Sequence, residues 1–375
     1  MSATPARRRN VFLLGGALAV GLGGVLVLTQ CTGSQTAVRD ENPELVAGAQ
    51  SYRTYCGLCH GDEGEGYAAD DANALRNQQF LASVDDAFLR AAIVRGHPGT
   101  SMAAYGERYG GPLNDAEING LIAFIRSWQT VPNAEMPAPD EGVALRAIPT
   151  WESQCASCHG SRGQGETALS LNNPVFLETA TPAQIRYAIV KGRDGTPMPA
   201  FEERLSMERI DDLVALIQSW GRQTDDPGAD EPEAMVPVIP EQLVLNPDGQ
   251  APRFSELREG RYVPSAEVAT ALEQGRRIVF LDARAPSDYV RYHLPGAIVS
   301  PYYDVQRLIE RLPRDGTWIV AYCGCPHAAS GRVMDALREA GFTNTAVLDE
   351  GVIHWKDEGY PIVTGVNPGT VADAE

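Results

Sequence analysis

The chain has 375 residues, 43% of them hydrophobic, and is therefore long enough for two or three domains that each bury a core. It carries 49 acidic against 31 basic residues, which gives a formal net charge of -18. Such a charge repels nucleic acid and anionic lipid, and this argues against both as partners. Protein partners are expected to offer a basic face.

Residues 1–31 have the pattern of an export segment. Three arginines precede an uninterrupted apolar run at 11–29, which is long enough to span a membrane. The run is expected to be either a cleaved signal peptide or a retained membrane anchor. Both alternatives place the rest of the chain on the periplasmic side, and the second adds a membrane association through residues 11–29.

Two pentapeptides further along the chain, CGLCH at 56–60 and CASCH at 155–159, share the pattern C-x-x-C-H. Two thiols one helical turn apart can reach both vinyl groups of one porphyrin, and a histidine directly after the second thiol is then held under the iron. Paired cysteines in an exported chain could instead form disulfides, but two matching copies argue for haem. The pattern predicts two covalently attached haem c groups. The expected attachment residues are Cys56, Cys59, Cys155 and Cys158, and the expected proximal ligands are His60 and His159.

The surroundings of the two pentapeptides also repeat, with a period of roughly 95 residues that indicates a domain duplication. Residues 91–105 fall on 187–201, so Met102 meets Met198. The segments 118–128 and 210–220 match as well, and their apolar residues recur with helical spacing, which predicts a closing helix in each copy. Thr181, Pro182 and Gln184 predict the start of another helix in the second copy, with a capping box.

With these motifs, residues 46–130 and 146–222 resemble class I cytochromes c. The resemblance implies a small all-helical fold around each haem and a distal methionine from a G-x-x-M-P loop. The sequence GTPMPAF at 195–201 fits that loop, while GTSMAAY at 99–105 lacks the proline. Met102 and Met198 are thus the implied distal ligands, and His/Met ligation suits electron transfer. His97 is an alternative ligand for the first iron, although its counterpart in the second copy is Arg193.

The composition changes after the second copy. Residues 223–257 are rich in acidic residues and proline, which predicts an extended linker. Apolar segments then alternate with helical patterns: strands are expected at 278–282, 318–322 and 345–349, and a helix at 330–341. This alternation predicts an α/β domain with a central parallel sheet.

The last segment, 258–364, resembles the rhodanese family. The resemblance rests on LDARAPSDYVRYHLPGAI at 281–298 and LDEGVIHWKDEGYPI at 348–362. It implies a catalytic cysteine at the end of a central strand, which reacts as a thiolate and then holds sulfur as a persulfide. The implied activity is transfer of sulfane sulfur. We expect the polar and turn residues of these stretches to be structural, namely Asp282, Arg284, His293, Pro295 and Gly351.

The expected catalytic loop reads CGCPH at 323–327. Cys323 directly follows the strand 318–322 and therefore matches the position of the nucleophile, with Cys325 as the alternative. The loop would be one residue longer than usual with Cys323 and one shorter with Cys325. The family's usual arginine is missing from the loop, which contains His327, and Arg332 lies only on the following helix. A third haem would need different spacing, a metal bound by the three residues would need a fourth ligand, and a Cys323–Cys325 disulfide is a further alternative.

The sequence thus predicts a multidomain protein with two all-α cytochrome c domains followed by an α/β rhodanese-like domain. The expected function is that of an exported dihaem c-type cytochrome that carries electrons. The rhodanese-like domain would bind or oxidise sulfane sulfur through a persulfide, so a reduced sulfur species is an expected partner besides a basic redox protein. Alternatively, that domain is an inactive docking or sensing module, or the haem units serve a membrane complex as a subunit.

Overall fold

The structure, a computed structural model, describes residues 42–221, 236–324 and 327–374. The expected export segment, the first part of the expected linker and Cys325 lie outside the described residues. In the described ranges, no helix is both long enough and apolar enough to cross a membrane. Residues 41–375 group into one unit that includes both the helical part and the α/β part.

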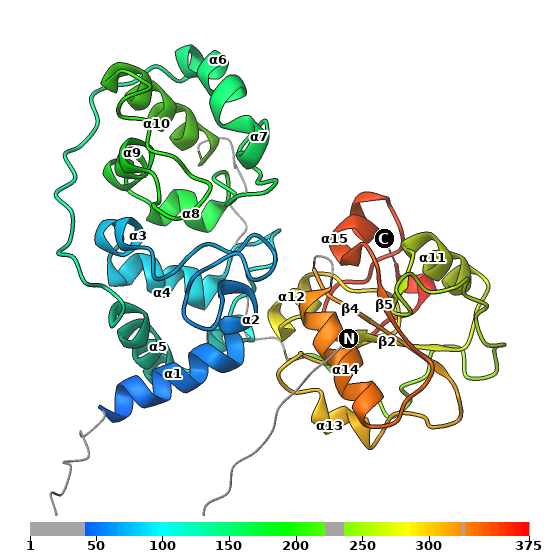
Figure 1. Cartoon of the computed structure of the whole chain (residues 1–375). Coiled ribbons are helices and arrows are strands. Elements are labelled where there is room, and N and C mark those ends of the chain that lie inside the picture. Colours follow the sequence, from blue (N-terminus) through cyan, green and yellow to red (C-terminus); the bar gives the residue numbers. More distant parts are fainter. Residues whose placement is uncertain (1–41, 222–235, 325–326, 375) are drawn as a thin grey trace, which may run out of the picture. The chain divides into compact units, whose positions relative to one another are not determined.

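The two repeats are helical, as expected, and have the same order of elements (Figure 1). A long first helix, a one-turn helix and two shorter helices precede the closing helix in each. The first repeat contains α1 (Pro43–Tyr55), α2 (Gly57–His60), α3 (Gln78–Ser83), α4 (Asp86–Arg95), the 3-10 turn η1 (Glu107–Tyr109) and α5 (Asp115–Arg126). The second contains α6 (Ala144–Gln154), α7 (Ala156–His159), α8 (Pro174–Thr179), α9 (Pro182–Lys191) and α10 (Met207–Gly221).

The closing helix of each repeat packs against the first helix of the same repeat, α5 on α1 and α10 on α6. The expected apolar stripes are confirmed as core, since Ile118 and Leu121 of α5 and Ile210 and Leu213 of α10 are at most 2% exposed. Close approach of α1 and α5 depends on Gly48, where a Cβ would lie 2.0 Å from the carbonyl oxygen of Gly120. The crossing therefore tolerates no side chain at that position.

The helix starts follow the capping signals in the sequence. In α9, Thr181 accepts a hydrogen bond from the Gln184 amide, and the Gln184 side chain accepts one from the Thr181 amide, with Pro182 in the first turn. This is the capping box expected from the sequence. Asn114 and Glu117 form a second capping box at the start of α5.

The α/β part contains one five-stranded sheet, entirely parallel, with the strand order β1-β5-β4-β2-β3. The strands are β1 (Tyr262–Val263), β2 (Ile278–Asp282), β3 (Ala297–Val299), β4 (Trp318–Tyr322) and β5 (Thr345–Leu348). The connecting helices are α11 (Ser265–Glu273), α12 (Pro286–Arg291), α13 (Gln306–Ile309), α14 (Ala328–Glu339) and α15 (Gly351–Asp357), and the 3-10 turn η2 (Val371–Asp373) follows. The predicted parallel sheet is confirmed, and one apolar cluster lies on each face.

A buried ion pair closes the end of β2. Arg284 donates to Asp282 at 2.6 Å and to the carbonyl of Tyr292, and both charged side chains are at most 6% exposed. His293 is fully buried and stacks on Tyr289 at a centroid distance of 3.8 Å. Asp282, Arg284 and His293 thus have structural roles, because each of these buried polar side chains has a partner inside the domain.

Candidate functional sites

The two C-x-x-C-H pentapeptides fold in the same way. Each first cysteine ends a long helix, and its amide donates to the residue four positions earlier: Cys56 to Tyr52 at 2.8 Å and Cys155 to Trp151 at 2.9 Å. A one-turn helix then carries the second cysteine and the histidine. The thiols of each pair are thus one turn apart, as attachment to a single porphyrin requires.

The histidine rings are oriented by backbone carbonyls. His60 Nδ1 lies 2.9 Å from the oxygen of Asn73, and His159 Nδ1 lies 2.9 Å from the oxygen of Leu169. A carbonyl can only accept, so Nδ1 carries the proton and Nε2 keeps its lone pair for a metal. Burial also lowers the pKa of both rings, which favours the neutral imidazole that binds iron.

The two methionine loops share one hydrogen-bond pattern. The Met102 amide donates to Thr100 Oγ1 at 3.1 Å, and the Met102 carbonyl accepts from the His97 amide at 2.7 Å. In the second repeat, Met198 makes the same two bonds with Thr196 and Arg193 at 3.2 Å and 2.9 Å. The loop of the first repeat therefore keeps both hydrogen bonds without the proline after Met102.

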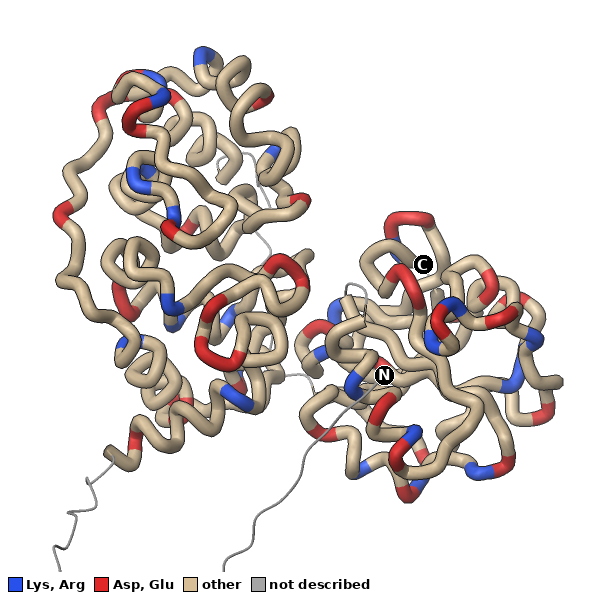
Figure 2. The backbone as a smooth tube through the Cα atoms, viewed as in Figure 1, with Lys and Arg blue, Asp and Glu red and all other residues tan. Residues whose placement is uncertain are grey.

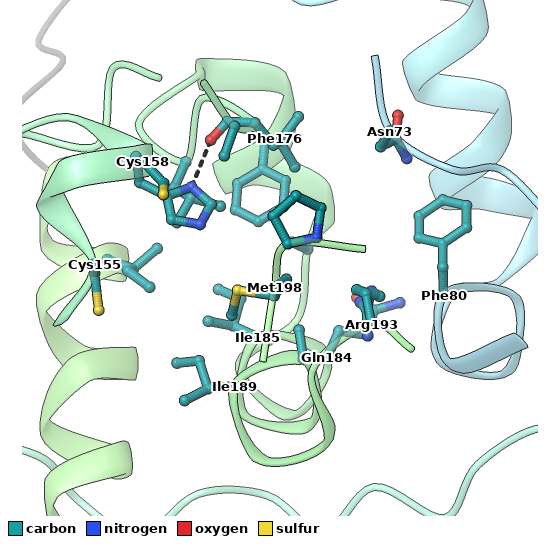
Figure 3. Close-up of a pocket in the computed structure, with 18 of the residues that line it drawn as sticks. Asn73, Phe80, Cys155, Cys158, Phe176, Gln184, Ile185, Ile189, Arg193 and Met198 are labelled. Carbon is teal, nitrogen blue, oxygen red and sulfur yellow. Dashed lines mark hydrogen bonds between the residues drawn. The ribbon is translucent and has the colours of Figure 1, made fainter. Parts of the chain in front are cut away.

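In the second repeat the predicted residues line one apolar cavity. Figure 3 shows Cys155 and Cys158 on one side and Met198 across from them, and His159 lines the same cavity. The rest of the wall is largely apolar and includes Phe176, Ile185 and Ile189.

Arg193 lines the same cavity and is a buried cation. In the described part of the chain it donates to the Gly192 carbonyl and to Ser83 Oγ, with no carboxylate within ion-pair distance. Burial lowers its pKa to about 10, because the charged form loses hydration. A haem brings two propionates, which would satisfy this guanidinium. The donor set and the unpaired cation thus fit a c-type haem held by two cysteines, His159, Met198 and Arg193.

Two aromatic side chains that the sequence analysis did not single out hold the glycine after each histidine. Tyr52 donates from its hydroxyl to the Gly61 carbonyl at 2.7 Å, and Trp151 donates from Nε1 to the Gly160 carbonyl at 3.1 Å. The two residues are 99 positions apart, the same offset as the cysteines. Aligning the two repeats could have revealed that Tyr52 and Trp151 are equivalent, but the two residues differ in type and were not recognised as a pair.

The two cytochrome repeats pack on each other through matched contacts. Asn77 donates from its amide to the Asp194 carbonyl at 2.9 Å, and Asn173 donates to the Pro98 carbonyl at 2.9 Å. Both pairs are related by the same offset of 96 residues, so each repeat uses the same surface. Helix α3 packs against α9, and α4 against α8. The contact is therefore nearly two-fold symmetric, as in an isologous dimer.

This packing connects the two histidine sites. The cavity of the second repeat is also lined by Tyr67, Asn73 and Phe80 of the first repeat, and Figure 3 shows Asn73 and Phe80 facing it. Asn73 is the residue whose carbonyl fixes His60. One residue thus lines the second site and orients the ligand of the first.

His97, the alternative ligand, is also in the first site. Burial, together with the charge of the neighbouring His60, lowers its pKa to about 4. The ring is therefore neutral and close to the proximal histidine.

The thiol loop begins where expected, directly after β4. Cys323 is 4% exposed, and its Sγ lies 3.2 Å from Ser330 Oγ of α14. Its carbonyl and that of Gly324 accept hydrogen bonds from the Val352 and Ile353 amides of α15. The neighbouring helices thus fix the first half of the loop. Cys325 lies outside the described residues.

His327 ends the loop and bonds to the end of β5. Its Nε2 lies 3.0 Å from Asp349 Oδ1, and its ring stacks on Tyr262 at 3.9 Å. Hydrogen bonds from Arg258 hold the pKa of Asp349 low, and the bond from His327 adds to this effect. The backbone of His327 has a φ of 90°, a strained conformation for a residue other than glycine. The contacts of its side chain with Asp349 and Tyr262 stabilise this conformation. We therefore assign His327 an anchoring role, and the sequence analysis missed its partners Asp349, Tyr262 and Arg258.

Two family models match the chain. The model described as cytochrome C oxidase, cbb3-type, subunit III matches residues 43–125 and 145–217. The model of the rhodanese-like domain matches residues 265–358. These segments coincide with the two helical repeats and with the sheet.

Several known proteins are similar to parts of the chain. A cbb3-type cytochrome c oxidase subunit FixP from Azorhizobium caulinodans is 28% identical over 198 residues, which cover 48% of this chain and 63% of that protein. A cytochrome bc1 complex cytochrome c subunit from Mycobacterium tuberculosis is 27% identical and covers 54% of this chain and 71% of its own. The solution structure of a rhodanese-like domain from Anabaena is 27% identical, covers 28% of this chain and 80% of its own, and has a TM-score of 0.26.

The chain spans less than two thirds of the length of the FixP relative, so the activity of that whole protein is not carried over. The family matches divide the chain as the structure does, into two helical repeats that each carry a C-x-x-C-H pattern and one α/β part. The chain thus has a helical cytochrome c region, which the cbb3-type subunit III model matches in two segments, followed by a rhodanese-like domain.

Proposed function

We propose that the protein is an exported dihaem cytochrome c with two His/Met haems. Cys56 and Cys59 would hold the first haem c and Cys155 and Cys158 the second. His60 with Met102, and His159 with Met198, would ligate the irons. The observation that carries this proposal is the repeated geometry: both histidines present Nε2 and both methionine loops have the same hydrogen bonds.

A thioether and an imidazole as the two protein ligands would leave the iron no open position, and this would suit electron transfer rather than oxygen chemistry. His97 is the competing ligand in the first site, because it is buried near His60. The match of Met102 with Met198 across the repeat favours the methionine.

We place the protein on the periplasmic side, with residues 11–29 as a cleaved signal or a membrane anchor. The arginines before that run support export. The names of the relatives, a cbb3-type oxidase subunit and a bc1 complex subunit, support electron exchange within a respiratory assembly.

The partner is expected to present a basic face. Figure 2 shows acidic residues gathered on the loop that follows α2 in the first repeat. The loop carries Asp62, Glu63, Glu65, Asp70 and Asp71. A basic partner would be steered toward this loop, and its association would weaken as salt is added.

For the rhodanese-like domain we propose that Cys323 binds or oxidises sulfane sulfur as a persulfide, with Cys325 as the alternative nucleophile. Support comes from the position of Cys323 at the carboxyl end of a central parallel strand, next to the first turn of α14. In doubly wound sheets this edge is where ligands bind. Ser330 Oγ, 3.2 Å from the sulfur, can donate a hydrogen bond to a thiolate.

The test is sulfur transfer from thiosulfate to cyanide by the full chain and by its Cys323→Ser and Cys325→Ser variants. We expect activity that Cys323→Ser abolishes and Cys325→Ser retains. If all three proteins transfer sulfur equally, or none does, the domain is a docking or sensing module instead.

A further inference from the structure

The thiol loop of the rhodanese-like domain lies against the methionine loop of the first cytochrome repeat. A Cβ placed on Gly324, the residue after Cys323, would be 3.5 Å from Ser101 Oγ and 3.8 Å from Ser101 Cα. Ser101 directly precedes Met102 in the sequence. Helix α14, which starts just after the thiol loop, also packs against α2, the helix of Cys59 and His60.

A second contact joins the segment after β3 to the end of α1. Tyr302 donates from its hydroxyl to the Tyr55 carbonyl at 2.8 Å. The ring of Tyr303 meets the ring of Tyr55 edge to face, with centroids 4.9 Å apart. Tyr55 directly precedes Cys56, so this contact reaches the first attachment cysteine of the first repeat.

A third contact lies at the start of α12. Ser287 is 7% exposed and donates from Oγ to the Ala104 carbonyl at 3.0 Å. Ala104 follows Met102 by two residues. Three separate segments of the rhodanese-like domain thus contact the residues that flank Cys56 and Met102. We call this set the thiol-haem interface: Tyr55, Ser101 and Ala104 on one side, and Ser287, Tyr302, Tyr303 and Gly324 on the other.

We propose that this interface makes the first haem, and not the second, the electron acceptor for sulfur bound on Cys323. The inference rests on the proposed persulfide chemistry and deepens it by naming the redox partner of the thiol. Gly324, Ser287 and Tyr302 contact residues beside the first site, whereas the described cavity of the second site is lined by residues of the two cytochrome repeats.

The step balances for hydrosulfide as substrate. An S–S bond forms between the Cys323 thiolate and the hydrosulfide sulfur, the S–H bond breaks, and its proton goes to solvent. The products are a Cys323 persulfide anion, one proton and two electrons. The first ferric haem would accept both electrons in succession and pass one of them on to the ferric haem of the second repeat, so the two haems of the chain together supply the two-electron oxidant.

The test is anaerobic mixing of the oxidised full chain with sulfide, with reduction of each haem followed separately. Met102→His and Met198→His variants assign the spectra of the two haems. We expect the first haem to be reduced before the second. A wedge at the interface, Ser287→Arg, is expected to slow this reduction about tenfold or more, because misplacement by an ångström already has large effects on rate. Ser255→Arg, the same change at an exposed residue outside the interface, is the matched control.

Tyr302→Phe is the milder interface variant, since it removes one hydroxyl and keeps the ring. Sulfur transfer to cyanide checks that the domain remains folded. If no haem is reduced by sulfide in the unaltered chain, the proposed sulfur oxidation itself fails. If reduction occurs but reaches the second haem first, or is unchanged in both interface variants, this inference alone is overturned.

A readout without turnover uses iodoacetate on the chain with Cys31→Ser and Cys325→Ser, in which Cys323 is the remaining cysteine outside the C-x-x-C-H motifs and takes the carboxymethyl group. The added negative charge stabilises nearby ferric iron, so it should lower the potential of the first haem more than that of the second. Equal shifts of both potentials would contradict the proximity of Cys323 to the first site.

Discussion

The paired asparagines between the cytochrome repeats give the sharpest prediction on stability. Asn173 is 2% exposed and uses both ends of its amide. Its oxygen accepts from the Val175 amide and caps α8, and its nitrogen donates to the Pro98 carbonyl at 2.9 Å. Asn173→Asp keeps the capping oxygen but replaces the donor with a second acceptor. The change therefore isolates the contact between repeats from the helix cap.

The expected cost follows from the burial of this contact. A buried carbonyl left without its donor costs about 1–3 kcal/mol, and here a carboxylate oxygen is also brought to within hydrogen-bond distance of it. We therefore expect Asn173→Asp to lower the free energy of unfolding by at least about 2 kcal/mol. Asn77→Asp should have a similar effect, because Asn77 makes the matching bond to the Asp194 carbonyl. The double variant should lose less than the sum, since both bonds serve one interface.

The assay is denaturant unfolding of the oxidised protein followed by haem absorbance. Asn172→Asp, the same change one residue earlier, is the control, because the Asn172 side chain accepts a bond from Ser170 within its own repeat. If Asn173→Asp is as stable as Asn172→Asp, the matched contact does not hold the repeats together.

Three further predictions concern single residues. A Cβ on Gly163, at a φ of 74°, would lie 2.4 Å from the Trp220 ring, so Gly163→Ala should lower the free energy of unfolding by about 2–4 kcal/mol. The control Gly195→Ala, where a Cβ would have no atom within 4 Å, should lower it by about 1 kcal/mol. Equal losses in the two variants would refute the clash. Asp349→Asn should cost about 1 kcal/mol at neutral pH. Because Arg258 depresses the native pKa of Asp349, that stabilisation is present above the ordinary aspartate pKa and is lost as pH falls through the native one, so unfolding curves of the two proteins should converge in acid. Arg193→Gln removes the buried cation from the second site and should lower the potential of that haem more than that of the first in a redox titration.

The sequence was sufficient for the parts of the protein that repeat or that keep a fixed spacing. The one-turn spacing of the paired cysteines and the histidine could be predicted because the pattern C-x-x-C-H keeps them adjacent, and both repeats fold in this way. The stripes of α5 and α10 could be predicted because the helix period is visible in Ile118, Leu121, Ile210 and Leu213. The parallel sheet followed from buried strands that alternate with helices.

The residues that the sequence did not reveal act through long-range contacts. Asn73 and Leu169 hold the histidines with backbone carbonyls, which carry no side-chain signature. Asp349 reaches His327 from the end of another strand, 22 positions along the chain. The interface residues Ser287 and Tyr302 carry no signal in the sequence, because their partners Ala104 and Tyr55 are distant along the chain.

The central claim is that both irons are ligated by histidine and methionine. The most direct test is the near-infrared sulfur-to-iron charge-transfer band of the oxidised protein, measured with the haem content per chain. We expect two haems c per chain, a band that roughly halves in Met102→His and in Met198→His, and no band in the double variant. A band that is unchanged in Met102→His would assign the first iron to His97, and absence of the band in the unaltered protein would contradict the account of both sites.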